Sequence, residues 1–245
     1  MEKSPTRPKD GYPYHAIEAG YYDRIFLKYS GVQSKWHHLK FTHVIKHMGN
    51  YQRHLDIGCG AGTLISQLPA DKISVGVDIA LTQIEYARAR YQTRRHHFLN
   101  TGPSAALPFG ENQFDVVTII EVIEHLSLDH NKQLLGEVLR VLKSGGVLLM
   151  TTPNYASLWP LVEIIVNKCS KVSYEDQHIT RFTRPRLSAM LNDLSFIEIS
   201  VRPFQWIAPF AAALGWGLAD WVERVESPWL SRWFGLLLFA QARKR

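Results

Sequence analysis

The segment Arg53–Gly62, with the sequence RHLDIGCGAG, constrains the fold of this 245-residue chain more than any other stretch. Its early residues, His54–Ile57, are typical of a short apolar strand, and three glycines follow at alternate positions. Glycine carries no Cβ, so a bulky ligand can approach the backbone of such a turn closely. We expect a helix to begin within Thr63–Leu68, with its first N–H groups directed toward that ligand.

A second apolar segment, Ile73–Val77, predicts the next strand and ends in Asp78. A carboxylate at this point can accept hydrogen bonds from two adjacent ribose hydroxyls. Strand, glycine turn, helix, strand and acid together form a nucleoside-binding βαβ unit. Thr63 stands where a dinucleotide-binding fingerprint would have its third glycine, so the spacing is G-x-G-x-G. The alternative is an ordinary glycine turn in a flavodoxin-like fold.

The rest of the chain alternates predicted strands with predicted helices, which indicates a parallel α/β sheet. The further strands are expected at His96–Leu99, Phe114–Ile120, Val147–Thr152 and Phe196–Arg202. The helices are expected from an N-cap at Ser34 to Met48, and at Thr82–Tyr91, Asn131–Leu142 and Arg184–Leu194. We therefore divide the chain into an N-terminal arm and lid (1–33) and one α/β domain (34–245) with insertions at 155–176 and 203–232.

Composition narrows the class of protein further. The formal net charge is +6, but the basic residues do not form one block, which favours a solvated surface over a nucleic-acid interface. The two cysteines, Cys59 and Cys169, imply no disulfide framework. No apolar signal segment and no run of 18 apolar residues is present, so we expect a cytoplasmic protein.

Four motifs together resemble the class I S-adenosylmethionine (SAM) methyltransferases. They are Asp56 with the glycine turn, LPFGENQFDVV from Leu107, IIEVIEHL from Ile119, and LLGEVLRVLKSGGVLLMTTPN from Leu134. The set is most similar to the ubiquinone-biosynthesis-type small-molecule O-methyltransferases. The resemblance implies SAM as cofactor and a seven-stranded Rossmann-like sheet of six parallel strands and one antiparallel last strand. It assigns that last strand to Leu236–Gln241 and makes the two insertions a helical cap.

The resemblance also implies which residues bind the methionine part of SAM. The backbone of Gly58, Cys59 and Gly60 would lie against it, and Asp56 would orient the loop or the amino group. Glu121, at the start of the loop after the fourth strand, would lie beside the same moiety.

For the adenosine part, the resemblance implies that Asp78 holds the ribose hydroxyls and that Ile79 packs on adenine. Many members of the family have an aspartate near the LPF motif that accepts from the adenine amino group. This chain has Pro103 at that position. We expect Ser104, or the backbone around Ala105, to make this contact instead.

Methyl transfer from a sulfonium is an in-line displacement that needs alignment, and a hydroxyl acceptor must also lose its proton. His125 and His178 are the candidate bases. His125 ends a pattern, Glu121-x-x-Glu124-His125, which in similar ubiquinone-pathway enzymes is associated with a divalent cation. On a helix these residues would share one face. The alternatives are that His125 packs near the cofactor, that Glu124 is solvated, and that His178 fixes its loop to the core.

The insertion 203–232 contains four of the seven tryptophans, and apolar residues recur at helical spacing at Ile207, Phe210, Ala211, Leu214 and Leu218. It is open whether this segment is a lid over an apolar acceptor, a peripheral membrane contact, a homodimer contact or core packing.

These features favour an enzyme that methylates a small or lipid-like acceptor such as a quinone precursor, polyketide, lipid or sugar, at a hydroxyl oxygen. N- or C-methylation and a non-catalytic SAM-binding regulatory subunit are the alternatives. Nucleic acid is disfavoured as a substrate because Thr152-Pro153-Asn154-Tyr155 is only a distant echo of the Asn-Pro-Pro-Tyr tetrad.

Overall fold

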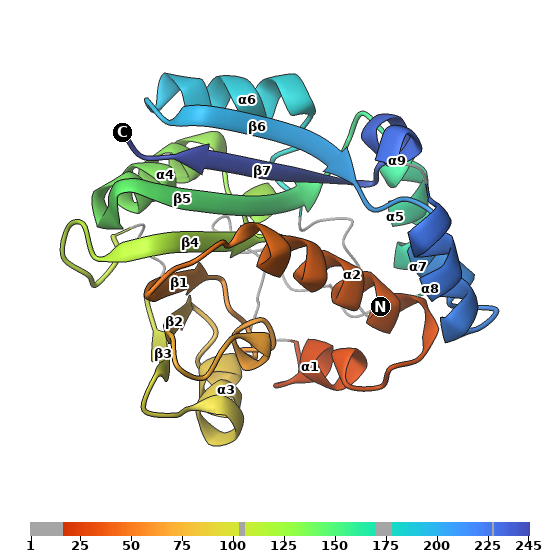
Figure 1. The fold of residues 1–245 in the computed structure, drawn as a ribbon, viewed down its shortest axis with the longest axis horizontal. Coiled ribbons are helices and arrows are strands. Elements are labelled where there is room, and N and C mark those ends of the chain that lie inside the picture. The colour runs from red at the N-terminus through yellow and green to blue at the C-terminus, as the bar shows by residue number, and fades with distance from the viewer. Residues whose placement is uncertain (1–16, 103–105, 170–177, 227) are drawn as a thin grey trace, which may run out of the picture.

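A computed structural model describes residues 17–102, 106–169, 178–226 and 228–245. Its core is a seven-stranded sheet in the order β3-β2-β1-β4-β5-β7-β6 (Figure 1). The strands are β1 Arg53–Ile57, β2 Ile73–Asp78, β3 His96–Asn100, β4 Phe114–Ile120, β5 Leu142–Pro153, β6 Ile197–Phe204 and β7 Leu237–Arg243. β7 runs antiparallel to both β5 and β6, and all other neighbouring strands are parallel. This confirms the predicted sheet, including its inserted last strand.

Helices surround the sheet and extend one end of it. They are α1 Tyr21–Phe26, α2 Gly31–His47, α3 Leu81–Tyr91, α4 Leu128–Val141, α5 Trp159–Cys169, α6 Arg184–Asp193, α7 Ala208–Ala211, α8 Trp216–Val225 and α9 Pro228–Phe234. In Figure 1, α5, α7, α8 and α9 gather at the end toward which β5 points. Among the described residues, no helix is both long and apolar enough to cross a membrane.

The apolar runs in the central strands are continuous because the sheet is buried on both faces. Val117 and Leu148 belong to the core shared with α4 and α6, whereas their neighbours Val116 and Leu149 belong to the core shared with α2 and α3. Successive side chains of a strand point to opposite faces, so both kinds of position must be apolar.

Two local predictions are wrong. Only Ile65–Gln67 forms a helical turn, of the 3₁₀ type, after the glycine loop. Pro69 follows closely, and proline cannot continue a helix because it lacks the N–H group. Ser34 is not an N-cap, because α2 already begins at Gly31 and the Ser34 hydroxyl donates to the carbonyl of Phe26 at 3.0 Å.

Asp23 fastens α1 to the glycine-loop half of the sheet. Its carboxylate is fully buried and accepts hydrogen bonds from the hydroxyls of Thr63 at 2.8 Å, Tyr86 at 2.9 Å and Tyr91 at 2.8 Å. Thr63 lies directly after the loop, and both tyrosines lie on α3. The described part of the N-terminal segment is therefore packed over the region where the sequence predicts a cofactor.

We expect Asp23→Ala to lower the free energy of unfolding by about 2–4 kcal/mol, because it leaves the hydroxyls of Thr63, Tyr86 and Tyr91 without their acceptor. Urea denaturation followed by circular dichroism measures this change. Asp71→Ala is the matched control, since the Asp71 side chain is 75% exposed, and it should change stability by less than about 0.5 kcal/mol. Equal effects of the two variants would contradict this role of Asp23.

Candidate active site

The glycine loop after β1 adopts backbone conformations that favour glycine. Gly58, Gly60 and Gly62 have φ angles of 75°, 49° and 79°. A Cβ at Gly58 would lie 2.3 Å from Val122 Cγ2, and one at Gly62 would lie 2.6 Å from the Phe98 ring. At Gly60 a Cβ would meet nothing within 4 Å. The loop is thus packed at both ends and open in the middle, where a ligand can reach its backbone.

Asp78 ties this open point to the end of β2. One carboxylate oxygen accepts from the N–H of Gly60 and the other from the N–H of Ala80, both at 2.8 Å. Burial raises the pKa of Asp78, and the backbone donors oppose that rise. The neighbouring Ile79 side chain is 50% exposed. A carboxylate with lone pairs to spare and an adjacent apolar surface suit a ribose and its base.

Asp56 lies beneath the loop at the end of a chain of buried side chains. The Thr118 hydroxyl donates to Asp56 at 2.5 Å, His54 Nε2 lies 2.8 Å from that hydroxyl, and Ser74 lies 3.4 Å from His54 Nδ1. Burial lowers the pKa of His54 to about 3, so its ring is neutral and its Nε2–H donates to Thr118. Burial and nearby Asp78 raise the pKa of Asp56 to about 7.

Glu121 follows β4 with a φ of 53° and forms an ion pair with Lys40 of α2. The Lys40 side chain is only 2% exposed, so α2 delivers a buried cation to the predicted methionine site. The sequence analysis missed Lys40, because nothing in the periodicity of α2 marks it as buried. It also predicted one helical face for Glu121, Glu124 and His125, which is wrong. The left-handed backbone at Glu121 precludes a continuous helix, and only Ile123–His125 forms a 3₁₀ turn, η3.

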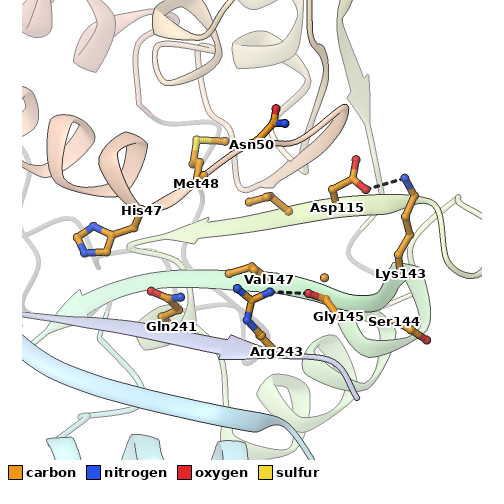
Figure 2. Close-up of a pocket in the computed structure, with 13 residues that line it drawn as sticks. His47, Met48, Asn50, Asp115, Lys143, Ser144, Gly145, Val147, Gln241 and Arg243 are labelled. Atoms are coloured by element: carbon orange, nitrogen blue, oxygen red, sulfur yellow. Dashed lines mark hydrogen bonds and ion pairs between the residues drawn. The ribbon is translucent and has the colours of Figure 1, made fainter.

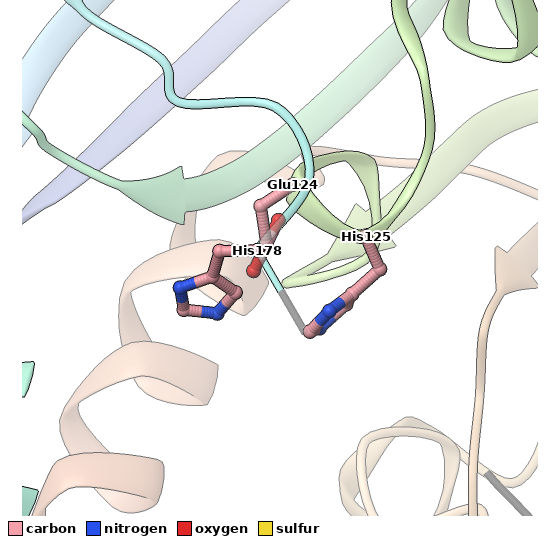
Figure 3. A group of neighbouring side chains, drawn as sticks. All are labelled: Glu124, His125 and His178. Carbon is pink, nitrogen blue, oxygen red and sulfur yellow. The ribbon is translucent and has the colours of Figure 1, made fainter. Parts of the chain in front are cut away.

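The structure instead groups Glu124 and His125 with His178 (Figure 3). One potential ligand atom from each lies within 4.8 Å of the others. Glu124 is 1% exposed and accepts from the Thr152 hydroxyl at 3.0 Å. Burial, followed by the charge of Glu121, raises the pKa of Glu124 to about 8. Glu124 is therefore buried, which contradicts the alternative that it is solvated.

The loop that carries His178 is held against η3 by Thr180. Its N–H donates to the carbonyl of Glu124 at 2.9 Å, and its hydroxyl donates to the carbonyl of Leu126 at 2.6 Å. These contacts bring His178 to the carboxyl edge of the sheet beside His125, with ring centroids 5.1 Å apart. The two candidate bases, predicted separately, are thus neighbours.

Glu163 of α5 and Tyr155 orient the His178 ring. Nδ1 lies 2.6 Å from a Glu163 carboxylate oxygen and 2.7 Å from the Tyr155 hydroxyl, which is itself within 3.2 Å of both oxygens of Glu163. Burial lowers the pKa of His178 to about 3, so the ring is neutral. With Nδ1–H donating to Glu163, the lone pair lies on Nε2, which is the tautomer that lets Nε2 accept a proton, and the lowered pKa makes this nitrogen a weak base. The sequence analysis missed both orienting residues.

Ser104 and Ala105, the predicted adenine contacts, lie outside the described residues. A separate pocket of about 300 Å³ lies at the opposite, amino edge of the sheet and is drawn in Figure 2. Asp115 at the start of β4 and Lys143 line it and form an ion pair at 2.6 Å. Because Asp78 and the glycine loop lie at the other edge, this pocket is not the nucleoside site.

A mostly parallel sheet with an open glycine turn after β1 and an acid at the end of β2 defines a Rossmann-like nucleoside-binding domain. Residues 55–150 match the family model described as "Methyltransferase domain". Over these residues the chain is similar to methyltransferase domains, and its sheet has the fold of the class I SAM-dependent methyltransferases.

Among similar proteins is the uncharacterized methyltransferase YcgJ of Bacillus subtilis, 27% identical over 72% of this chain and 66% of that protein. The ubiquinone/menaquinone biosynthesis C-methyltransferase UbiE of a Geobacter species is 35% identical over 42% of this chain and 47% of its own length. This chain thus spans less than two thirds of either relative.

The fold is also that of solved structures. A SAM-dependent methyltransferase from Thermotoga maritima, described as a possible histamine N-methyltransferase, superposes with a TM-score of 0.65 at 18% identity. The match covers 91% of this chain and 94% of the other.

We expect the wild-type protein to lose stability relative to Glu124→Gln as pH rises from about 5 to 8, because the Glu124 carboxyl group contributes a falling component over this range. The folded-state pKa of Glu124, about 8, lies above its ordinary value of 4.5, so the folded state holds a proton that the unfolded chain has released. The stabilisation is complete below about pH 4.5 and is lost as pH rises through about 8. Thermal unfolding across this range measures it. Glu85→Gln, at an exposed position, is the control that should keep the wild-type slope; a Glu124→Gln slope equal to wild type would refute the assignment.

Proposed function

We propose that this protein transfers the methyl group of SAM to a hydroxyl oxygen of a small or lipophilic acceptor. The observation that supports this most is the proximity of two sites at one edge of the sheet. The glycine loop and Asp78 end β1 and β2 there, and the Glu163–His178 pair lies against the turn after β4. Methylation of a hydroxyl requires a cofactor-binding site beside an oriented, neutral histidine.

SAM, when bound, supplies a methyl group on a positively charged sulfur. Asp78 and the backbone at Gly60 bind and orient the adenosyl part. His178 removes the proton from the acceptor hydroxyl as the new oxygen–carbon bond forms and the sulfur–carbon bond breaks. The products are S-adenosylhomocysteine and a methyl ether, and the proton leaves through the histidine. The ion pair between the buried Lys40 and Glu121 fixes the turn after β4 beside the proposed cofactor site.

Carbon and nitrogen acceptors are the alternatives, since one relative is named a C-methyltransferase and one solved neighbour a possible N-methyltransferase. An activated carbon acceptor also needs a base, so His178 serves that reaction as well. A SAM-binding regulatory subunit would need no oriented histidine. The partly buried Tyr155–Glu163–His178 arrangement therefore favours an enzyme over a regulator.

The cluster of Glu124, His125 and His178 also suits the binding of a divalent cation. One carboxylate and two imidazoles within 4.8 Å form a donor set that suits Zn²⁺ or Mn²⁺. Glu124 would have to lose the proton that its raised pKa favours, so cation binding would strengthen with rising pH. In this version Glu124, His125 and His178 hold the metal, and Glu121 is replaced as a ligand by His178.

We expect Asp78→Asn to weaken SAM binding by about 10- to 100-fold, because charged acceptors of ribose hydroxyls contribute about 1.5–3 kcal/mol. Isothermal titration with SAM and S-adenosylhomocysteine measures the effect. Asp129→Asn, at an exposed position on α4, should bind SAM like wild type. Wild-type affinity in Asp78→Asn would remove the proposed cofactor site.

For a methyl acceptor found by screening with labelled SAM, we expect His178→Ala to lower kcat by about 10²–10⁴-fold with little change in SAM affinity. His125→Ala should have a smaller effect if His178 is the base. Loss of activity on EDTA treatment, restored by Mn²⁺ or Zn²⁺, would favour the metal version. Full turnover in both histidine variants would contradict both versions.

A further inference from the structure

Helix α8 turns its polar side toward the protein and its apolar side toward solvent. Asp220 forms an ion pair with Lys35 of α2, and Glu223 lies 3.8 Å from the same ammonium, whose side chain is 5% exposed. On the other side, Leu218, Trp221 and Val225 are 41%, 55% and 55% exposed. A surface helix of a soluble protein normally has the opposite arrangement.

Helix α5 and the residue before it repeat this inversion. Glu163 points inward to His178, whereas Leu158, Leu161 and Ile164 are each more than half exposed. The spacing of these three residues places them on one helical face.

The two inverted helices belong to one end of the molecule (Figure 1). Trp36 of α2 connects them, since its ring lies 5.7 Å from that of Trp159 on α5 and 6.3 Å from that of Phe210 on α7, and α7 contacts α8. Further exposed apolar side chains of this end are Ile207, Phe210, Leu214, Trp233 and Phe234. We call this set, together with the outward residues of α5 and α8, the apolar cap face. Many exposed apolar side chains at one end of a molecule indicate an interaction site.

The charged residues of the cap favour an anionic binding partner. Each carboxylate in its described residues is turned to a protein partner: Glu163 to His178, Asp220 and Glu223 to Lys35, and Glu226 to the N–H groups of Ile207 and Ala208 and the hydroxyl of Ser231. Arg224 and Arg232 are exposed. Tryptophan and arginine beside aliphatic side chains are typical of segments that lie in a membrane interface.

We propose that the apolar cap face docks onto the surface of a bilayer that contains anionic lipids. The exposed tryptophans and aliphatic side chains enter the interface, and the arginines contact lipid phosphates. No described helix can span the bilayer, so the attachment is peripheral. Insofar as it rests on the proposed function, the inference adds that the acceptor is lipid-soluble, because the inner side of α5 contacts His178 and its outer side would contact the membrane.

The test is co-sedimentation of the full chain with vesicles of phosphatidylcholine alone and of phosphatidylcholine with about 30% phosphatidylglycerol. We expect binding to the anionic vesicles, weakened by high salt, and at least about a tenfold loss for Leu218→Gln/Trp221→Gln/Val225→Gln. The matched control is Leu81→Gln/Leu99→Gln/Leu128→Gln, at exposed apolar positions outside the cap, which should bind like wild type.

Circular dichroism shows whether the cap variant is folded, and isothermal titration shows whether it still binds SAM. A cap variant that is folded and binds SAM but not vesicles supports the docking surface, whatever the acceptor proves to be. Wild-type vesicle binding by the folded cap variant would overturn the proposal. A wild-type protein that does not bind anionic vesicles would also overturn the proposal. The same holds if analytical ultracentrifugation shows that the wild-type protein is a dimer and the cap variant a monomer, since the face would then be a contact between two copies.

Discussion

The buried Asp56 carboxylate imposes the constraint on which the site depends. It must be opposite Thr118, and the register of β1 and β4 pairs these two residues directly. A shift by one residue would turn Asp56 toward the apolar core shared with α4, where no donor could replace the hydroxyl. The ends of the same two strands carry the glycine loop and the Glu121 turn. One polar pair therefore fixes the relative position of the two segments that the proposed cofactor site combines.

Electrostatics extend this constraint across the edge of the sheet. Burial raises the pKa of Asp56 to about 7 and that of Glu124 to about 8, and it also raises the pKa of Asp78, so burial opposes negative charge at this edge of the sheet. Lys40, a buried cation, pairs with Glu121, and its charge acts to lower the pKa of Glu124. A ligand with both a sulfonium and an ammonium group would supply further positive charge, whereas its demethylated product has lost one of these charges. Under the proposed function, charge alone would therefore favour binding of the methyl donor over its product.

Much of the fold could be predicted from the sequence because its strands are buried on both faces and appear as continuous apolar runs. Phe114–Ile120 is such a run, and β4 has the same bounds. The inserted strand β7 came from family resemblance and not from periodicity. Local sequence patterns gave wrong predictions where contacts between distant residues determine the structure. The Glu121-x-x-Glu124-His125 spacing suits a helix, but the positive φ of Glu121 turns the chain before η3, and His178 takes the place assigned to Glu121.

Hydrophobic periodicity shows which residues share a face but not which way that face points. The apolar positions from Ile207 to Leu218 predicted one helical face. The helix is interrupted, however, and Gly215 has a φ of 148°, so Phe210 and Ala211 lie on α7 whereas Leu218 lies on α8. The direction of α8 is set by Lys35, which is remote in sequence and attracts Asp220 and Glu223 inward. Glu163 does the same for α5 through His178. In both helices a carboxylate is turned toward an interior partner, Lys35 for α8 and the neutral His178 for α5, and aliphatic side chains face solvent on the other side. The same contacts therefore determine the interior of the protein and the character of its cap.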